Sequence, residues 1–171
     1  MREVFWNKLD RIARHLAPFL MTLMLLVLNH VPLHIAGLSR ITPVLAMIAV
    51  FHWGVFRPDL LPIYAVFTIG LLQDFLGGGA LGVWTFIFLI VYKTAMLQRR
   101  FFVGKGFALV WLGFGVLSAG AMFVAWFLNA LLFGIFSNIQ APFYQFFVTL
   151  GLYGPVGFIF LRFQQILFVS D

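Results

Sequence analysis

Six apolar segments with short breaks between them fill this chain almost from end to end. A helix that crosses a bilayer takes about 20 apolar residues, with a range of roughly 17–25. Inside hydrocarbon each backbone polar group needs a partner in its own segment, so such segments fold as α-helices. We expect helices at residues 16–35, 42–56, 60–76, 80–97, 107–133 and 143–163.

The break between the second and third segments contains only Arg57, Pro58 and Asp59. A five-span alternative would join these two segments into one crossing. The joined run is far too long for one crossing, and Pro58 would interrupt its helix. We therefore expect a tight turn here, with Asp59 near a helix N-terminus, where a negative charge is favourable.

Composition supports a membrane environment. Hydrophobic residues make up 63% and charged residues 9% of the chain, against roughly 45–50% and about 25% in soluble domains. No polar block is long enough for a separate soluble module. We expect an all-α membrane protein with one integral membrane domain: a cytoplasmic interfacial helix at 1–15, six transmembrane helices within 16–163 and a cytoplasmic tail at 164–171.

The basic residues indicate topology, because Lys and Arg collect in cytoplasmic loops. With six spans and a cytoplasmic N-terminus, only Arg40 of the 11 basic residues lies outside. Both termini are then cytoplasmic, and the net charge of +6 is explained without nucleic acid. The cytoplasmic set comprises Arg2, Lys8, Arg11, Arg14, Arg57, Lys93, Arg99, Arg100, Lys105 and Arg162.

The first fifteen residues resemble the basic head of a signal peptide. The following apolar run exceeds the usual 7–15 residues and has no small-residue cleavage site, so we expect it to be retained. Phe5, Leu9 and Ile12 share one helical face, with basic residues on another. This spacing predicts an interfacial helix; the alternative is a basic flank without stable helix.

One carboxylate and a run of glycines lie between the third and fourth segments. Gly70, Asp74, Gly78 and Gly82 recur every four residues, with Gln73 alongside. We expect the glycines to end the helix after Phe75 and to reverse the chain, because glycine permits sharp turns and close backbone approach.

Three hypotheses compete for Asp74. It caps a neighbouring helix N-terminus or accepts N–H bonds in the glycine turn, a purely structural role. It belongs to a surface that docks a partner's membrane helix. Or it binds a proton, cation or polar ligand, as intramembrane carboxylates do in transporters. The third ranks last, because no second buried acid or base is available for a relay.

The fifth segment has glycines at a seven-residue spacing, Gly106, Gly113 and Gly120, and a small pair at Gly115 and Ala119. Small residues let membrane helices pack closely. Ordinary bundle packing explains this pattern, and a dedicated partner groove is the alternative.

No pattern indicates catalysis. His30, His34 and His52 lack a carboxylate at ligand spacing, so hydrogen bonding near the membrane surface is favoured over metal binding. Cysteines number 0, and the motifs of serine hydrolases, zinc proteases and phosphate-binding loops are missing. We expect no enzyme activity, metal or cofactor.

The run Trp53-Gly-Val-Phe-Arg57-Pro58-Asp59-Leu, then Phe67-Thr-Ile-Gly70-Leu-Leu-Gln73-Asp74, then Gly77, Gly78 and Leu81-Gly82 resembles the rod shape-determining protein MreD family. The likeness covers roughly residues 43–97, and the chain's size and six-span layout fit the rest. It marks Trp53, Arg57, Pro58, Gly70, Asp74, Gly78 and Gly82 as family-signature positions.

The resemblance implies a bacterial inner-membrane protein that works with MreC, the actin-like MreB and the elongation glycosyltransferase and transpeptidase to build the lateral cell wall. It also implies a fold like the substrate-binding subunits of energy-coupling-factor transporters. Our leading hypothesis is a non-enzymatic scaffold that binds MreC, with candidate faces at the Asp74 corner and at Gly113. Alternatives are a small-molecule-binding transporter subunit, with Asp74 and Gln73 facing an outer pocket, and an oligomeric ion pore.

Overall fold

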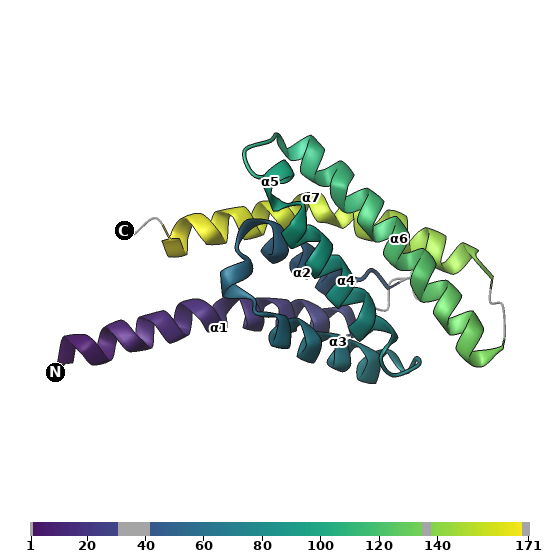
Figure 1. Ribbon diagram of the computed structural model, residues 1–171, viewed down its shortest axis with the longest axis horizontal. Helices are drawn as coiled ribbons and strands as arrows, with labels where there is room; N and C mark the ends of the chain where they lie inside the picture. The colour runs from purple at the N-terminus through teal and green to yellow at the C-terminus, as the bar shows by residue number, and fades with distance from the viewer. Residues whose placement is uncertain (1, 31–41, 135–137, 169–171) are drawn as a thin grey trace.

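The structure, a computed structural model, describes the backbone of residues 2–30, 42–134 and 138–168 and the side chains of 16–30, 42–134 and 138–162. Over these residues the secondary structure is entirely helical (Figure 1). The elements are α1 (Arg2–His30), α2 (Leu45–Phe56), the 3₁₀ helix η1 (Pro58–Leu60), α3 (Ile63–Gly77), α4 (Val83–Leu97), α5 (Arg99–Phe102), α6 (Phe107–Phe133) and α7 (Gln140–Phe168).

Each of the six predicted apolar segments overlaps one of the longer helices, which confirms the all-α prediction. Helix α1 begins earlier than the first predicted segment, α7 extends beyond the last one at both ends, and α3 and α4 begin later than predicted. Helix α3 begins only after Pro62, because Pro58 first opens the 3₁₀ turn η1. Helix α4 begins only after Gly82, whose φ of 96° lies outside helical geometry. The break at 57–59 is therefore a tight turn, as predicted.

At the N-terminus, α1 is continuous from Arg2 to His30. The predicted helix over residues 1–15 and the first apolar segment thus form a single helix, which speaks against a flank without stable helix. Its position at the membrane interface stays a prediction. Residues 31–41, with His34 and Arg40, lie outside the described part of the chain.

Helix lengths differ widely. Among the described residues, two stretches, Phe107–Phe133 and Gln140–Arg162, are long and apolar enough to cross a membrane alone. The apolar parts of the other helices, Leu16–His30, Leu45–Phe56, Ile63–Gly77 and Val83–Leu97, are shorter. A 15-residue helix is about 22 Å long, against a hydrocarbon core of about 30 Å. Bilayer thinning can absorb such a mismatch, and six crossings stay a prediction.

Helix α2 lies at the centre of the molecule, in contact with α1, α4 and α7 (Figure 1). All of its residues from Ala46 to Val55 are buried. A helix that is apolar on every side is stable only where other helices surround it. The short, uniformly apolar second segment therefore forms the core.

Aromatic rings join α2 to the later helices. The Phe51 ring centroid lies 5.3 Å from that of Phe114 on α6 and 6.0 Å from those of Phe102 on α5 and Tyr153 on α7. Such tilted and edge-to-face pairs stabilise a core beyond simple burial. The Phe51 ring of α2 therefore contacts rings on α5, α6 and α7 at the same time.

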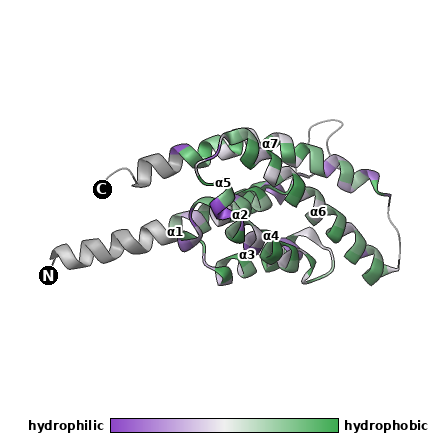
Figure 2. Cartoon of the chain, turned by 45° about the horizontal axis from the view of Figure 1, so that its top comes forward, coloured by the Kyte–Doolittle hydropathy of each residue, from purple (hydrophilic) through white to green (hydrophobic). Residues whose placement is uncertain are grey.

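Hydrophobic residues cover most of α6 and α7, and hydrophilic residues concentrate toward the helix ends (Figure 2). The start of α1 and the end of α7 lie at the same end of the molecule (Figure 1). This arrangement is the one that an even number of crossings would produce.

Helices α3 and α4 are in close contact at Gly70. A Cβ atom placed on Gly70 would lie 2.5 Å from the Cα of Thr85. Because the obstacle is backbone, only a shift of one helix could relieve the clash.

We expect Gly70→Ala to lower the free energy of unfolding by about 1–3 kcal/mol, the usual cost of overpacking. Thermal unfolding of the detergent-solubilised protein would measure it. Gly151→Ala on α7 is the matched control, since nothing lies within 4 Å of that position. Equal midpoints for both variants would contradict the role of Gly70.

Candidate functional site

The α3–α4 corner reverses the chain within a few residues. Gly78 ends α3 with φ at 64°, and Gly82 precedes α4 with φ at 96°. Both values lie in the left-handed region that glycine adopts without steric cost. The two glycines return the start of α4 to the last turn of α3. The predicted glycine break is confirmed, although α3 continues two residues beyond Phe75.

Asp74 lies inside this corner and is 1% exposed. Its Oδ1 accepts a hydrogen bond from the Trp84 N–H at 2.8 Å. Its Oδ2 accepts from the Gly82 N–H at 2.9 Å, the Thr85 N–H at 3.1 Å and the Thr85 hydroxyl at 2.7 Å. Four donors at one end of α4 therefore surround a single carboxylate.

This geometry makes Asp74 the cap of α4. The first N–H groups of a helix have no partner within the helix, and the residue at the N-cap usually supplies an oxygen. Here the N-cap is Gly82, which has no side chain, so the carboxylate comes from the preceding helix instead. The positive end of the helix dipole adds a favourable interaction with the negative charge.

The capping hypothesis for Asp74 is thus confirmed. An isolated carboxylate among apolar helices is costly, and the four hydrogen bonds offset that cost. Because the side chain is buried and fully engaged, the contacts give no support to Asp74 as a group that itself meets a partner or ligand.

Other polar groups gather near the cap. Gln73 is 5% exposed, and its Oε1 accepts no hydrogen bond from the described residues. A Cβ on Gly79 would lie 3.9 Å from Oδ1 of Asn129 on α6. The amide nitrogen of Asn129 donates to the Ala125 carbonyl at 2.8 Å. The glycine loop therefore meets the end of α6.

Trp53, Arg57 and Pro58 lie elsewhere, at the turn between α2 and η1. Trp53 is fully buried, with its ring 5.5 Å from that of Phe160. The Tyr92 hydroxyl donates to the Pro58 carbonyl at 3.0 Å, which fixes the turn to α4. Arg57 is exposed at the same turn.

The glycine stripe of α6 is only partly confirmed. A Cβ on Gly113 would clash with the ring of Phe102, so α5 packs against α6 at this point. Gly106 and Gly120 have nothing within 4 Å, and the prediction of close helix contact is wrong for both. Gly115 does face α7, where Leu150 lies 3.4 Å from the added Cβ.

The predicted positions therefore do not form one site. Five of them, Gly70, Gln73, Asp74, Gly78 and Gly82, build the α3–α4 corner. Sequence reasoning missed Thr85, which donates hydrogen bonds to Asp74 and packs against Gly70. Its signal was a hydroxyl residue in the otherwise apolar first turns of α4.

The histidines divide between two environments. His30 Nδ1 lies 2.9 Å from the Leu26 carbonyl oxygen, as expected for hydrogen bonding at a helix end. The expectation is wrong for His52, which is fully buried among Phe56 and Phe160 with neither ring nitrogen bonded to a described residue. The described residues contain no group of three His, Cys, Asp or Glu side chains that could hold a metal.

Comparison with known families gives one match. The family model described as rod shape-determining protein MreD matches residues 10–166. No curated protein and no solved structure matches the chain. The likeness to energy-coupling-factor subunits therefore stays a prediction.

We expect Asp74→Ala to destabilise the protein by about 2–4 kcal/mol, because it leaves buried N–H donors of α4 without an acceptor. The stability of Asp74→Asn should lie between that of Asp74→Ala and that of the wild type. Its side chain keeps one oxygen acceptor, but its NH₂ group faces some of the N–H donors. Thermal unfolding in detergent measures both. Asp59→Ala, at an exposed acid, is the control and should change stability by less than about 0.5 kcal/mol.

Proposed function

Because the chain belongs to the rod shape-determining protein MreD family, we propose that it is a non-enzymatic scaffold of the lateral cell-wall elongation machinery and binds MreC. Family membership itself gives a membrane protein with a role in rod shape determination. The binding of MreC is our extension of that role.

The observation that carries the proposal is that Asp74 caps α4. The most conspicuous carboxylate of the apolar region is committed to four hydrogen bonds that hold α3 to α4. Proton or ion chemistry needs a group that can change its partners. A carboxylate fixed in this way is suited to holding the α3–α4 corner in one conformation.

The surface that Asp74 shapes is the rim of the α3–α4 corner. Phe75, Leu76 and Leu81 are 74%, 51% and 66% exposed. Gly77, between them, has nothing within 4 Å of an added Cβ, so the backbone is open to close approach. Without a hydrophobic driving force in lipid, helices associate by close packing at such small residues. We assign this rim to MreC. We favour this rim over Gly113, because the ring of Phe102 lies against that glycine.

The proposed orientation places both termini in the cytoplasm and the α3–α4 corner on the outer side of the bacterial inner membrane. The distribution of Lys and Arg supports it, and so does the common end shared by the start of α1 and the end of α7. Contact with the elongation glycosyltransferase and transpeptidase would follow at the outer side, and contact with MreB would be indirect.

The second candidate, a small-molecule-binding transporter subunit, placed Asp74 and Gln73 in an outer pocket. Of these two residues, Gln73 alone keeps a buried oxygen without a hydrogen-bond partner among the described residues, and one such group is few for a polar ligand site. A stoichiometric small molecule in mass spectra of the gently purified protein would favour this candidate over the scaffold.

The rim predicts a pattern of MreC binding. We expect Phe75→Ala combined with Leu81→Ala to reduce MreC recovery in co-purification at least about fivefold, because both side chains protrude from the corner. Stability should change little at such exposed positions.

Phe158→Ala combined with Ile159→Ala is the matched control, at 58% and 57% exposure on α7, away from the corner. MreC recovery equal to the wild type is expected for the control. If both pairs behaved alike, the rim would not be the binding face.

The orientation can be mapped because the chain contains 0 cysteines. We expect Gly79→Cys to react with a membrane-impermeant maleimide added to intact spheroplasts, and Gly106→Cys to react only after permeabilisation. Both glycines are exposed and have room for a Cβ. The reverse pattern would invert the proposed topology.

A further inference from the structure

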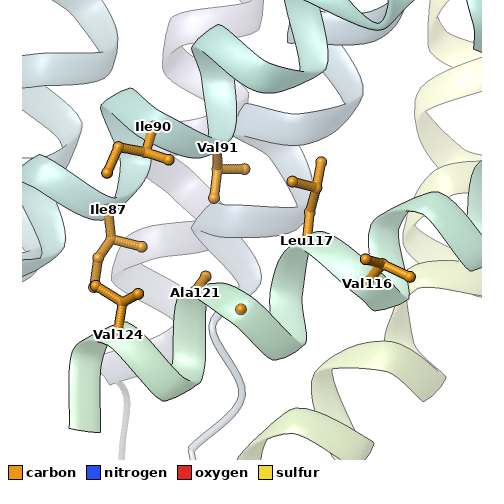
Figure 3. Close-up of a pocket in the computed structure, with 8 residues that line it drawn as sticks. Ile87, Ile90, Val91, Val116, Leu117, Ala121 and Val124 are labelled. Atoms are coloured by element: carbon orange, nitrogen blue, oxygen red, sulfur yellow. The ribbon is translucent and has the colours of Figure 1, made fainter. Parts of the chain in front are cut away.

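One face of α6 lines two cavities that adjoin. The first, of about 460 Å³, lies between α5 and α6 and is lined by Phe101, Leu109 and Leu112 among others. The second, of about 220 Å³, lies between α4 and α6 (Figure 3). Val116 and Leu117 line both. We call the joined feature the α6 groove.

The lining of the α6 groove is almost entirely apolar. Figure 3 shows Ile87, Ile90 and Val91 of α4 facing Ala121 and Val124 of α6 across it. Its lining runs along α6 from Leu109 to Val124, about 22 Å at 1.5 Å per residue. Half of a bilayer's hydrocarbon core is about 15 Å. The groove is therefore long enough to hold an extended acyl chain.

Gly120 explains why this part of α6 is open. No atom lies within 4 Å of a Cβ added there, and Gly120 belongs to the lining of the second cavity. The unfilled position in the glycine stripe is thus part of the groove.

Basic residues adjoin one end of the groove in the sequence: Arg99 and Arg100 lie between Gln98 and Phe101, which line the first cavity, whereas Lys105 lines a neighbouring cavity with Phe107 and Val110. Arg99 and Arg100 are on α5, and Lys105 follows in the loop to α6. Residues 75–170 contain no Asp or Glu, so these three cations have no acidic neighbour within that half of the sequence. Among the described residues, none of the three forms a salt bridge.

We propose that the α6 groove binds an anionic phospholipid, with its phosphate at Arg99, Arg100 and Lys105 and an acyl chain along α6. The proposed topology serves here only to assign the lipid to the cytoplasmic leaflet. The acyl chain is surrounded by hydrocarbon whether free or bound, so the groove supplies shape and the cations supply the preference for an anionic headgroup, at about 1 kcal/mol per Lys or Arg.

The positive charge at the end of the groove disfavours a protein helix as the occupant. A partner's transmembrane helix has its own Lys and Arg at the cytoplasmic flank, where they would meet Arg99, Arg100 and Lys105. A second copy of this chain would bring the same cations. Like charges at short distance repel, whereas a phosphate is attracted.

The test is native mass spectrometry of the full chain in detergent, titrated with phosphatidylglycerol or with phosphatidylethanolamine of the same acyl chains. We expect the wild type to retain phosphatidylglycerol preferentially. Arg99→Gln, Arg100→Gln and Lys105→Gln should each lower that affinity about fivefold, the factor that corresponds to 1 kcal/mol. The control variants Lys8→Gln, Arg11→Gln and Arg14→Gln remove equal charge at the N-terminus and should leave the affinity unchanged.

A second pair of variants tests the groove without changing charge. Gly120→Leu should fill it and lower phosphatidylglycerol binding at least about fivefold. Gly151→Leu, at an equally open glycine of α7, should leave binding as in the wild type. The proposal is overturned if the wild type shows no headgroup preference, if the control variants lose binding equally, or if Gly120→Leu removes a second protein chain instead of a lipid.

Discussion

The hydrogen bonds of Asp74 are the interaction on which the rest of the structure depends. A buried carboxylate in an apolar protein is stable only if donors surround it, and the start of α4 supplies four. Gly70 lets the two helices approach closely enough for these bonds to form. Because α4 also contacts α2 and α6, its position fixes the central helix and the wall of the α6 groove.

The corner rim and the charged end of the α6 groove lie at opposite ends of α4. The corner rim is at its start and is apolar, with open glycine backbone, whereas the charged end of the α6 groove follows its last residue, Leu97. A partner chain at the rim and a lipid headgroup at the charged end would therefore not compete. Such a division suits a scaffold, which gathers several components by shape and charge and needs no reactive group.

Much of the fold could be predicted because hydrocarbon imposes helices of limited length on apolar sequence. Helix α6 has the predicted bounds, and the glycine reversal lies where it was expected. The four-residue helix α5 was missed, since a single turn has no periodic pattern. Its Phe102 is the reason that Gly113 is packed while Gly120 is open. Equal spacing along one helix cannot show which neighbour meets each position.

The sequence by itself determined a helical membrane protein, its family, the positions of the breaks and the asymmetry of its charges, because these follow from local hydropathy, from glycine and proline geometry and from residue type. The tertiary structure alone decided that Asp74 caps α4, that His52 is buried without a described hydrogen-bond partner, and that α4, α5 and α6 enclose a groove beside three cations. Those properties depend on which helices become neighbours, and contacts between distant segments are set by packing in three dimensions.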